Sequence, residues 1–90
     1  MKKIHELKIL IDYAEMVHRG VKTFELRKND RDFHVGDLIR FRVVDYYTLP
    51  MVEFEKTLFE ITCVVNYPDA LKDSYVCLGI RKYSNAGLQS

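Results

Sequence analysis

The stretch that decides the fold is Gly20-Val21-Lys22-Thr23-Phe24-Glu25-Leu26-Arg27. Polar and apolar side chains alternate from residue 22 to residue 28, which is typical of a β-strand with two different faces. Phe24 and Leu26 share one face. Thr23, Glu25 and Arg27 share the other. The alternation therefore predicts a strand with one apolar face and one face of polar side chains that can take part in binding or catalysis.

A short helix is expected before this strand. Asp12 is a candidate N-cap, and Glu15 three residues later would complete a capping box. Gly20 is expected at the helix C-terminus because glycine accepts the left-handed backbone found there, and Arg19 suits the negative end of the helix dipole. The apolar stripe of this helix is expected to consist of Tyr13, Met16 and Val17.

Three further strands follow from the same alternation, at residues 4–10, 38–46 and 56–67, and the mostly apolar run at 75–80 predicts a final, buried strand. The buried faces predicted for the first three are His5, Leu7 and Ile9; Ile39, Phe41 and Val43; and Phe59, Ile61, Cys63 and Val65. Residues 47–52, which include Pro50, read as a connection, and residues 69–74 as a short connector. Five strands and one helix without regular alternation predict a mostly β, α+β domain: a small, partly closed barrel with the helix packed at its side.

The size and charge of the chain limit what it can be. Its 90 residues, 48% of them hydrophobic, suffice for one domain, expected at residues 1–83, followed by a polar, flexible tail at 84–90. Most hydrophobic residues are needed for the core. The net charge of +1 argues against a polycationic protein that coats duplexes. Residues 19–42 nevertheless hold seven cations against four carboxylates, a local excess that either attracts an anion or belongs to a solvated mixed surface.

The two cysteines, Cys63 and Cys77, form no CxxC pair, so a zinc site is not expected. The sequence shows neither a secretory leader nor an apolar stretch of roughly 20 residues. These features favour a cytoplasmic protein without a membrane partner.

The segment 20–27 fits the pattern GxKxxExR at every defined position, and this pattern resembles the signature of ASCH domains. The flanks resemble a largely bacterial and phage-borne ASCH-like subfamily of unknown function, through His5-Glu6-Leu7-Lys8-Ile9, Arg27-Lys28-Asn29-Asp30-Arg31-Asp32-Phe33, Val35-Gly36-Asp37 and Tyr75-Val76-Cys77-Leu78-Gly79-Ile80. The resemblance implies a PUA-like β-barrel whose GxKxxExR segment lines a cleft beside the helix. It also implies RNA-linked roles by kinship.

Lys22, Glu25 and Arg27 are the central candidates for binding RNA or a nucleotide. Arg27 can grip a phosphate with two hydrogen bonds, Lys22 adds a compact charge, and Glu25 can accept from the polar edge of a base. The alternative is a surface ion pair worth at most about 1 kcal/mol beside a solvated lysine. His5, Asn29 and Arg31 are candidate neighbours, with a core histidine and ordinary turn chemistry as their alternatives. No metal and no cofactor is assigned.

Two other functions stay open. Some ASCH-like proteins are amidohydrolases acting on acylated cytidine: their lysine matches Lys22, but their nucleophilic threonine falls at Glu25, and Thr23 lies one alternation step away. Glu25 could instead act as a general base toward water, with Lys22 and Arg27 stabilising the anion, as in a hydrolase or ribonuclease. The third possibility is a protein-interaction domain with a protein partner.

Overall fold

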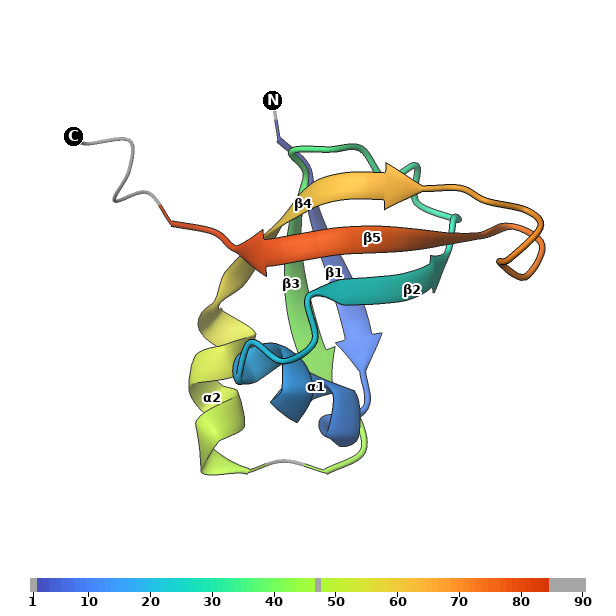
Figure 1. The fold of residues 1–90 in the computed structure, drawn as a ribbon. Helices are drawn as coiled ribbons and strands as arrows, with labels where there is room; N and C mark the ends of the chain where they lie inside the picture. Colours follow the sequence, from blue (N-terminus) through green and yellow to red (C-terminus); the bar gives the residue numbers. More distant parts are fainter. Residues whose placement is uncertain (1, 47, 85–90) are drawn as a thin grey trace.

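The structure is a computed structural model that describes residues 2–46 and 48–84 of the chain. It is an α+β domain made mostly of strands (Figure 1). The elements in chain order are β1 (Ile4–Ile9), α1 (Ile11–His18), β2 (Phe24–Lys28), β3 (Leu38–Val43), α2 (Leu49–Lys56), β4 (Leu58–Val65) and β5 (Tyr75–Lys82). The five strands that the sequence predicts are therefore present.

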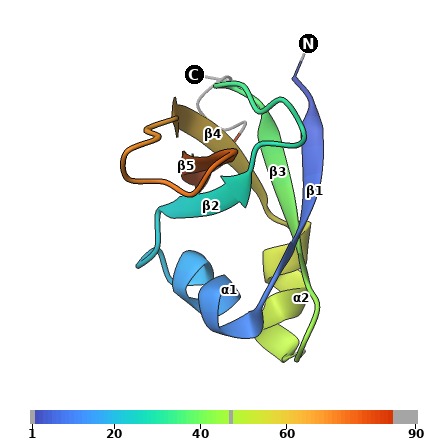
Figure 2. The same cartoon turned by 90° about the vertical axis from the view of Figure 1, so that its right-hand side faces the viewer.

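The strands form one mixed sheet in the order β1-β3-β4-β5-β2. Only β1 and β3 are parallel, and the other three pairs are antiparallel. The sheet curls into a half-barrel, with β1 and β2 as its two edges (Figure 2). The predicted barrel-like fold is thus confirmed in its coarse form, but the barrel is not closed.

The core fills the inner side of this half-barrel. Phe41 of β3 stacks on Phe54 of α2 with ring centroids 5.5 Å apart, and Phe59 of β4 packs edge-on against Phe41 at the same distance. The alternation predicted for β1 is confirmed, since His5, Leu7 and Ile9 are all buried. Burial of these aromatic and aliphatic side chains is the main stabilising contribution.

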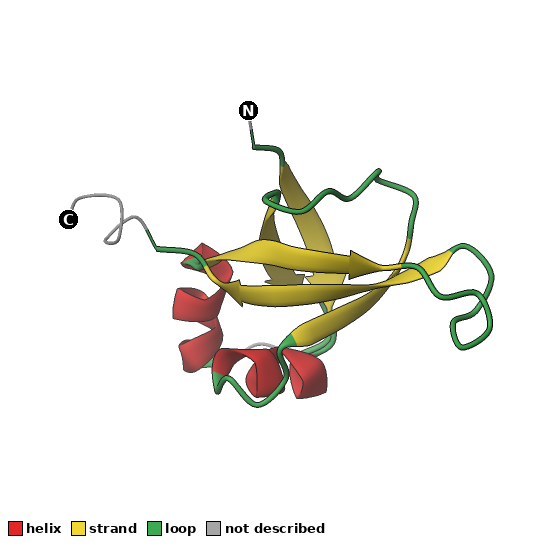
Figure 3. Ribbon diagram, turned by 45° about the horizontal axis from the view of Figure 1, so that its top comes forward, coloured by secondary structure: helices red, strands yellow, loops and turns green. Residues whose placement is uncertain are grey.

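The helix α2 was not expected from the sequence, which indicated a connection and the start of a strand there. Pro50 misleads because it normally interrupts regular structure, yet here it occupies the first turn, where its missing N–H is not needed. Apolar Val52 and Phe54 alternate with Glu53 and Glu55, which imitates a strand. The helix buries Met51 and Phe54, which lie three residues apart on one face. The structure therefore has two helices at this end of the half-barrel, where the sequence predicted one (Figure 3).

The inward face predicted for β4 is wrong beyond Ile61. A β-bulge separates Ile61 from Cys63, so the next inward residue is Val64, and Cys63 is exposed. Gly79 of β5 lies opposite the bulge, where an added Cβ would be 2.6 Å from Cys63 Sγ and 2.7 Å from Thr62 Oγ1. A glycine is therefore required where two side chains of β4 crowd one position of β5.

The predicted N-terminus of α1 is also wrong. Leu10, not Asp12, is the N-cap residue, and its side chain makes no capping bond. The backbone N–H of Ile11 instead donates to Asp45 Oδ1 at 2.7 Å. A carboxylate 34 residues away caps the helix, which local sequence spacing cannot reveal.

No helix in the described part of the chain is long and apolar enough to cross a membrane. Of the predicted polar tail at 84–90, residues 85–90 lie outside the described residues.

Candidate functional site: a pocket between α1 and β2

The end of α1 places Lys22. The N–H of Gly20 donates to the Val17 carbonyl at 3.0 Å, and the N–H of Val21 donates to the Met16 carbonyl at 2.9 Å. This is the Schellman pattern, which needs a left-handed residue at Gly20, where φ is +77°. The predicted C-terminus of the helix is thus confirmed, and the turn directs the chain from α1 into β2.

The strand β2 has its faces in an unexpected orientation. Glu25 points into the half-barrel and is only 7% exposed. Phe24 and Leu26 lie on the outer side and are 44% and 52% exposed. The alternation was therefore predicted correctly, but the polar side faces the interior and the apolar side faces solvent. Both are exceptions to the expectation that hydrophobic residues build the core.

Glu25 is held by two cations. Its Oε1 accepts a hydrogen bond from Lys22 Nζ at 2.8 Å, and its Oε2 accepts one from Arg27 Nε at 3.0 Å. Lys22 Nζ also donates to the Phe24 carbonyl at 2.7 Å. An ammonium group carries three protons, so one remains for a ligand. The Glu25–Arg27 ion pair considered from the sequence is present, but it is largely buried rather than at the surface, and Lys22 is bonded to Glu25 rather than solvated.

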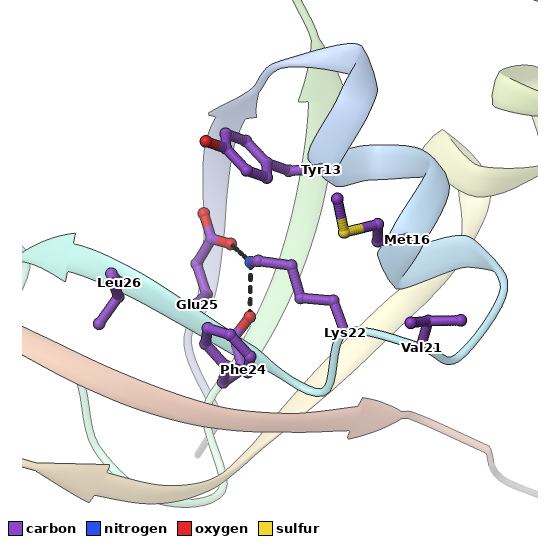
Figure 4. A pocket seen from close by; sticks show the side chains of 7 residues that line it. All are labelled: Tyr13, Met16, Val21, Lys22, Phe24, Glu25 and Leu26. Atoms are coloured by element: carbon purple, nitrogen blue, oxygen red, sulfur yellow. Dashed lines mark hydrogen bonds and ion pairs between the residues drawn. The ribbon is translucent and has the colours of Figure 1, made fainter.

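A pocket of about 420 Å³ opens above this ion cluster. Tyr13 and Met16 contribute from α1, Val21 and Lys22 from the linker, and Phe24, Glu25 and Leu26 from β2 (Figure 4). The ammonium of Lys22 lies 4.8 Å from the centre of the Phe24 ring and 5.6 Å from that of Tyr13. The pocket therefore combines aromatic walls with a polar floor, a composition typical of small-ligand sites.

Two arginines connect the open edges of the half-barrel. Arg27 Nη2 donates to the Lys8 carbonyl, and Arg31 Nη1 donates to the Glu6 carbonyl at 3.0 Å. Both acceptors belong to β1, which is an edge strand of the sheet formed by the described residues. Arg27 thus joins Glu25 to β1, and Arg31, in the loop after β2, also bonds to β1; neither arginine is among the residues that line the pocket.

His5 lies in the core, away from the pocket. Its Nε2 lies 2.9 Å from Asp37 Oδ2, and its ring packs against Phe33 at 4.8 Å. Burial by itself would raise the pKa of Asp37, but the hydrogen bond with His5, backbone N–H groups and the His5 charge together lower it below its usual value. The core alternative for His5 therefore fits its surroundings.

The other candidates fall outside the pocket as well. Asn29 follows β2 at the far end from Lys22, and its backbone N–H donates to the Ser74 carbonyl at 2.7 Å. Thr23, weighed as a nucleophile, lines a second hollow on the other side of the linker. Among the described residues no cluster of three or more potential metal ligands occurs.

The sequence reasoning missed Tyr13, Met16 and Phe24 as pocket residues. Tyr13 and Met16 were assigned to the buried stripe of α1, but the residues buried there are Ala14 and Val17. Ala14 was the available signal, because a small side chain three residues before Val17 permits close packing of the helix. The stripe rotated in this way leaves Tyr13 and Met16 facing β2.

The fold and the site together define a small half-barrel domain with an aromatic-walled, ion-floored pocket. The chain belongs to the family described as a domain of unknown function, DUF3850, whose model matches residues 4–80. It is also 35% identical over 78 residues to the "Uncharacterized 12.9 kDa protein in GpA 3'region" of Escherichia phage P2. That match covers 87% of this chain and 68% of the phage protein, so a phage protein is among its relatives.

Proposed function

We propose that this domain is an RNA- or nucleotide-binding module of the ASCH type within the PUA-like superfamily, acting in the cytoplasm. The observation that carries the proposal is the placement of the Lys22–Glu25 pair at the floor of a pocket flanked by the rings of Tyr13 and Phe24. The GxKxxExR resemblance supports the class, and the two unpaired cysteines support the compartment.

A nucleobase suits both components of this pocket. Its flat faces can stack on the Tyr13 or Phe24 ring, as bases do in proteins that bind single strands. Its polar edge can accept a hydrogen bond from the third proton of the Lys22 ammonium. It can also donate a hydrogen bond to Glu25, because each carboxylate oxygen has a second lone pair that is still free. A ligand without a flat face would use the polar floor but could not stack on the two aromatic walls.

The experiment is an NMR titration of labelled protein with a short mixed-sequence RNA and, separately, with cytidine. We expect amide shifts concentrated at residues 13–16 and 21–27. Replacing Tyr13 by Ala should weaken binding roughly tenfold or more, because one stacked base contributes about 1–3 kcal/mol. Tyr67→Ala is the matched control, since Tyr67 is an exposed tyrosine outside the pocket.

Shifts scattered over the surface, or equal losses for Tyr13→Ala and Tyr67→Ala, would refute the pocket assignment. Product signals from an acylated cytidine in the same tube would instead establish a hydrolase.

A protein-interaction domain is the second candidate, because the outer face of the sheet exposes apolar residues. Phe24 and Leu26 of β2 lie beside Cys77 and Gly79 of β5, and Val65 of β4 pairs with Cys77. Salt distinguishes the two functions: RNA binding should weaken steeply as salt rises, whereas association through an apolar face should change little.

A further inference from the structure

A second hollow, of about 340 Å³, lies across the linker from the aromatic-walled pocket. The linker forms the ridge between them: Val21 and Phe24 line only the first, Gly20 and Thr23 line only the second, and Lys22 lines both. The two hollows are therefore neighbours that one covalently continuous ligand can occupy together.

The second hollow is strongly cationic. Arg19, Lys22, Arg81 and Lys82 line it, against one carboxylate, that of Glu53. The hydroxyl-bearing residues Thr23 and Thr57 add polar groups to its wall. The wall of the hollow is open at Gly20, because a Cβ atom added there would have no other atom within 4 Å.

The positive charge of this hollow is balanced only in part by neighbouring carboxylates. Glu25 is shared between Lys22 and Arg27, and Glu60 is shared between Arg81 and Lys2. Arg19 and Lys82 form no ion pair with any residue in the described part of the chain. Such an excess of cations in a concave surface focuses the field on an anion.

We infer that the second hollow binds a phosphate group, and that it holds the backbone phosphate next to the base bound in the first pocket. This inference rests on the proposed function and deepens it, since it assigns a single-stranded polynucleotide as the ligand and gives its path over the linker. Arg19 and Lys82 contact the phosphate, and Lys22 links the two subsites. Phosphate contacts of this kind fix the position of a strand while the base carries selectivity.

The phosphate subsite can be tested without RNA. Labelled protein is titrated with inorganic pyrophosphate and, in parallel, with sodium chloride at matched ionic strength. We expect saturable shifts at residues 18–23 and 81–82 with pyrophosphate alone, and affinity lowered roughly tenfold or more in Arg19→Gln/Lys82→Gln, which removes two charge-assisted contacts. Shifts equal to those with sodium chloride would overturn the inference.

A second arm places the subsite on the path of the nucleic acid. With a short mixed-sequence RNA, Arg19→Gln/Lys82→Gln should reduce the slope of log affinity against log salt by about 1, while cytidine binding stays unchanged. An unchanged slope would overturn the path across the linker even if the first pocket binds RNA. Cytidine 5′-monophosphate binding as tightly as the RNA would identify a free nucleotide, rather than a chain, as the source of the phosphate.

Failure of the proposed function has a different signature. In that case neither RNA nor cytidine shifts residues 13–16 and 24–26, whatever pyrophosphate does at the second hollow.

Discussion

The strands β2 and β3 have similar alternating sequences, but β3 turns its apolar side chains inward and β2 turns its polar side chains inward. In β3, Ile39 and Phe41 face the core and Arg40 and Arg42 face solvent. In β2, Glu25 faces the interior, whereas Phe24 and Leu26 are exposed. Buried ion pairs contribute little net stability because their desolvation is costly. The inner face of β3 therefore stabilises the fold, whereas the inner face of β2 forms part of the candidate site.

The largest effect should come from the inner face of β3. Replacing Phe41 by Ala removes a fully buried ring from the stack with Phe54 and leaves a cavity. The free energy of unfolding should fall by about 3–5 kcal/mol. Urea denaturation followed by circular dichroism measures it, and a loss below about 1 kcal/mol would contradict the role given to β3.

Glu25→Gln tests the inner face of β2 by leaving two cations without their carboxylate. The expected loss is about 3 kcal/mol, at the lower end for a broken buried ion pair, because Arg27 keeps some solvent contact. Glu15→Gln, an exposed change on α1, is the matched control and should be nearly neutral. Equal losses in the two variants would show that Glu25 is not held as described.

Asp37→Asn separates the His5 pair from the pocket. We expect a loss of about 1–3 kcal/mol at neutral pH, with RNA binding unchanged. Because the pKa of Asp37 is lowered in the folded state, its contribution is present above the unfolded pKa of about 3.9 and is lost as pH falls through the folded value.

The wild-type protein should therefore lose more stability than Asp37→Asn when pH is lowered below about 4, as thermal melts would show. Asp69→Asn, at an exposed position, should behave like the wild type. Parallel pH profiles for Asp37→Asn and the wild type would refute the contribution of the pair.

The smallest effect should come from the outer face of β2. Leu26→Thr keeps a residue suited to a strand and changes a side chain that is 52% exposed, so stability should change by only about 0.5 kcal/mol. Chemical denaturation alongside Phe41→Ala makes the comparison direct. A loss near that of Phe41→Ala would mean that the outer face of β2 is covered.

The sequence predicted those features that depend on neighbouring residues. Alternation revealed four of the strands, a mostly apolar run revealed β5, and Gly20 marked the end of α1, because all three signals depend on neighbouring residues. What alternation cannot reveal is which face turns inward: in β2 that depends on distant residues, among them Lys8 of β1, whose carbonyl accepts the Arg27 bond. The cap from Asp45 and the bulge opposite Gly79 likewise depend on residues distant in sequence.

The candidate site was predicted in its polar part only. Lys22, Glu25 and Arg27 were expected together because they share a short alternating stretch, and the structure brings them into one cluster. The aromatic walls were missed, since Tyr13 and Phe24 read as ordinary core residues in a chain this small.

One measurement tests the central claim, that the inner face of β2 serves a ligand rather than the fold. The triple variant Lys22→Met/Glu25→Met/Arg27→Met replaces the ion cluster by unbranched apolar side chains, and both its unfolding free energy and its affinity for a short mixed-sequence RNA are measured. We predict that stability changes by less than about 1 kcal/mol, since well-packed apolar residues commonly replace buried ions without loss, while RNA binding disappears. A stability loss of about 3 kcal/mol or more, or RNA binding equal to that of the wild type, would contradict the claim.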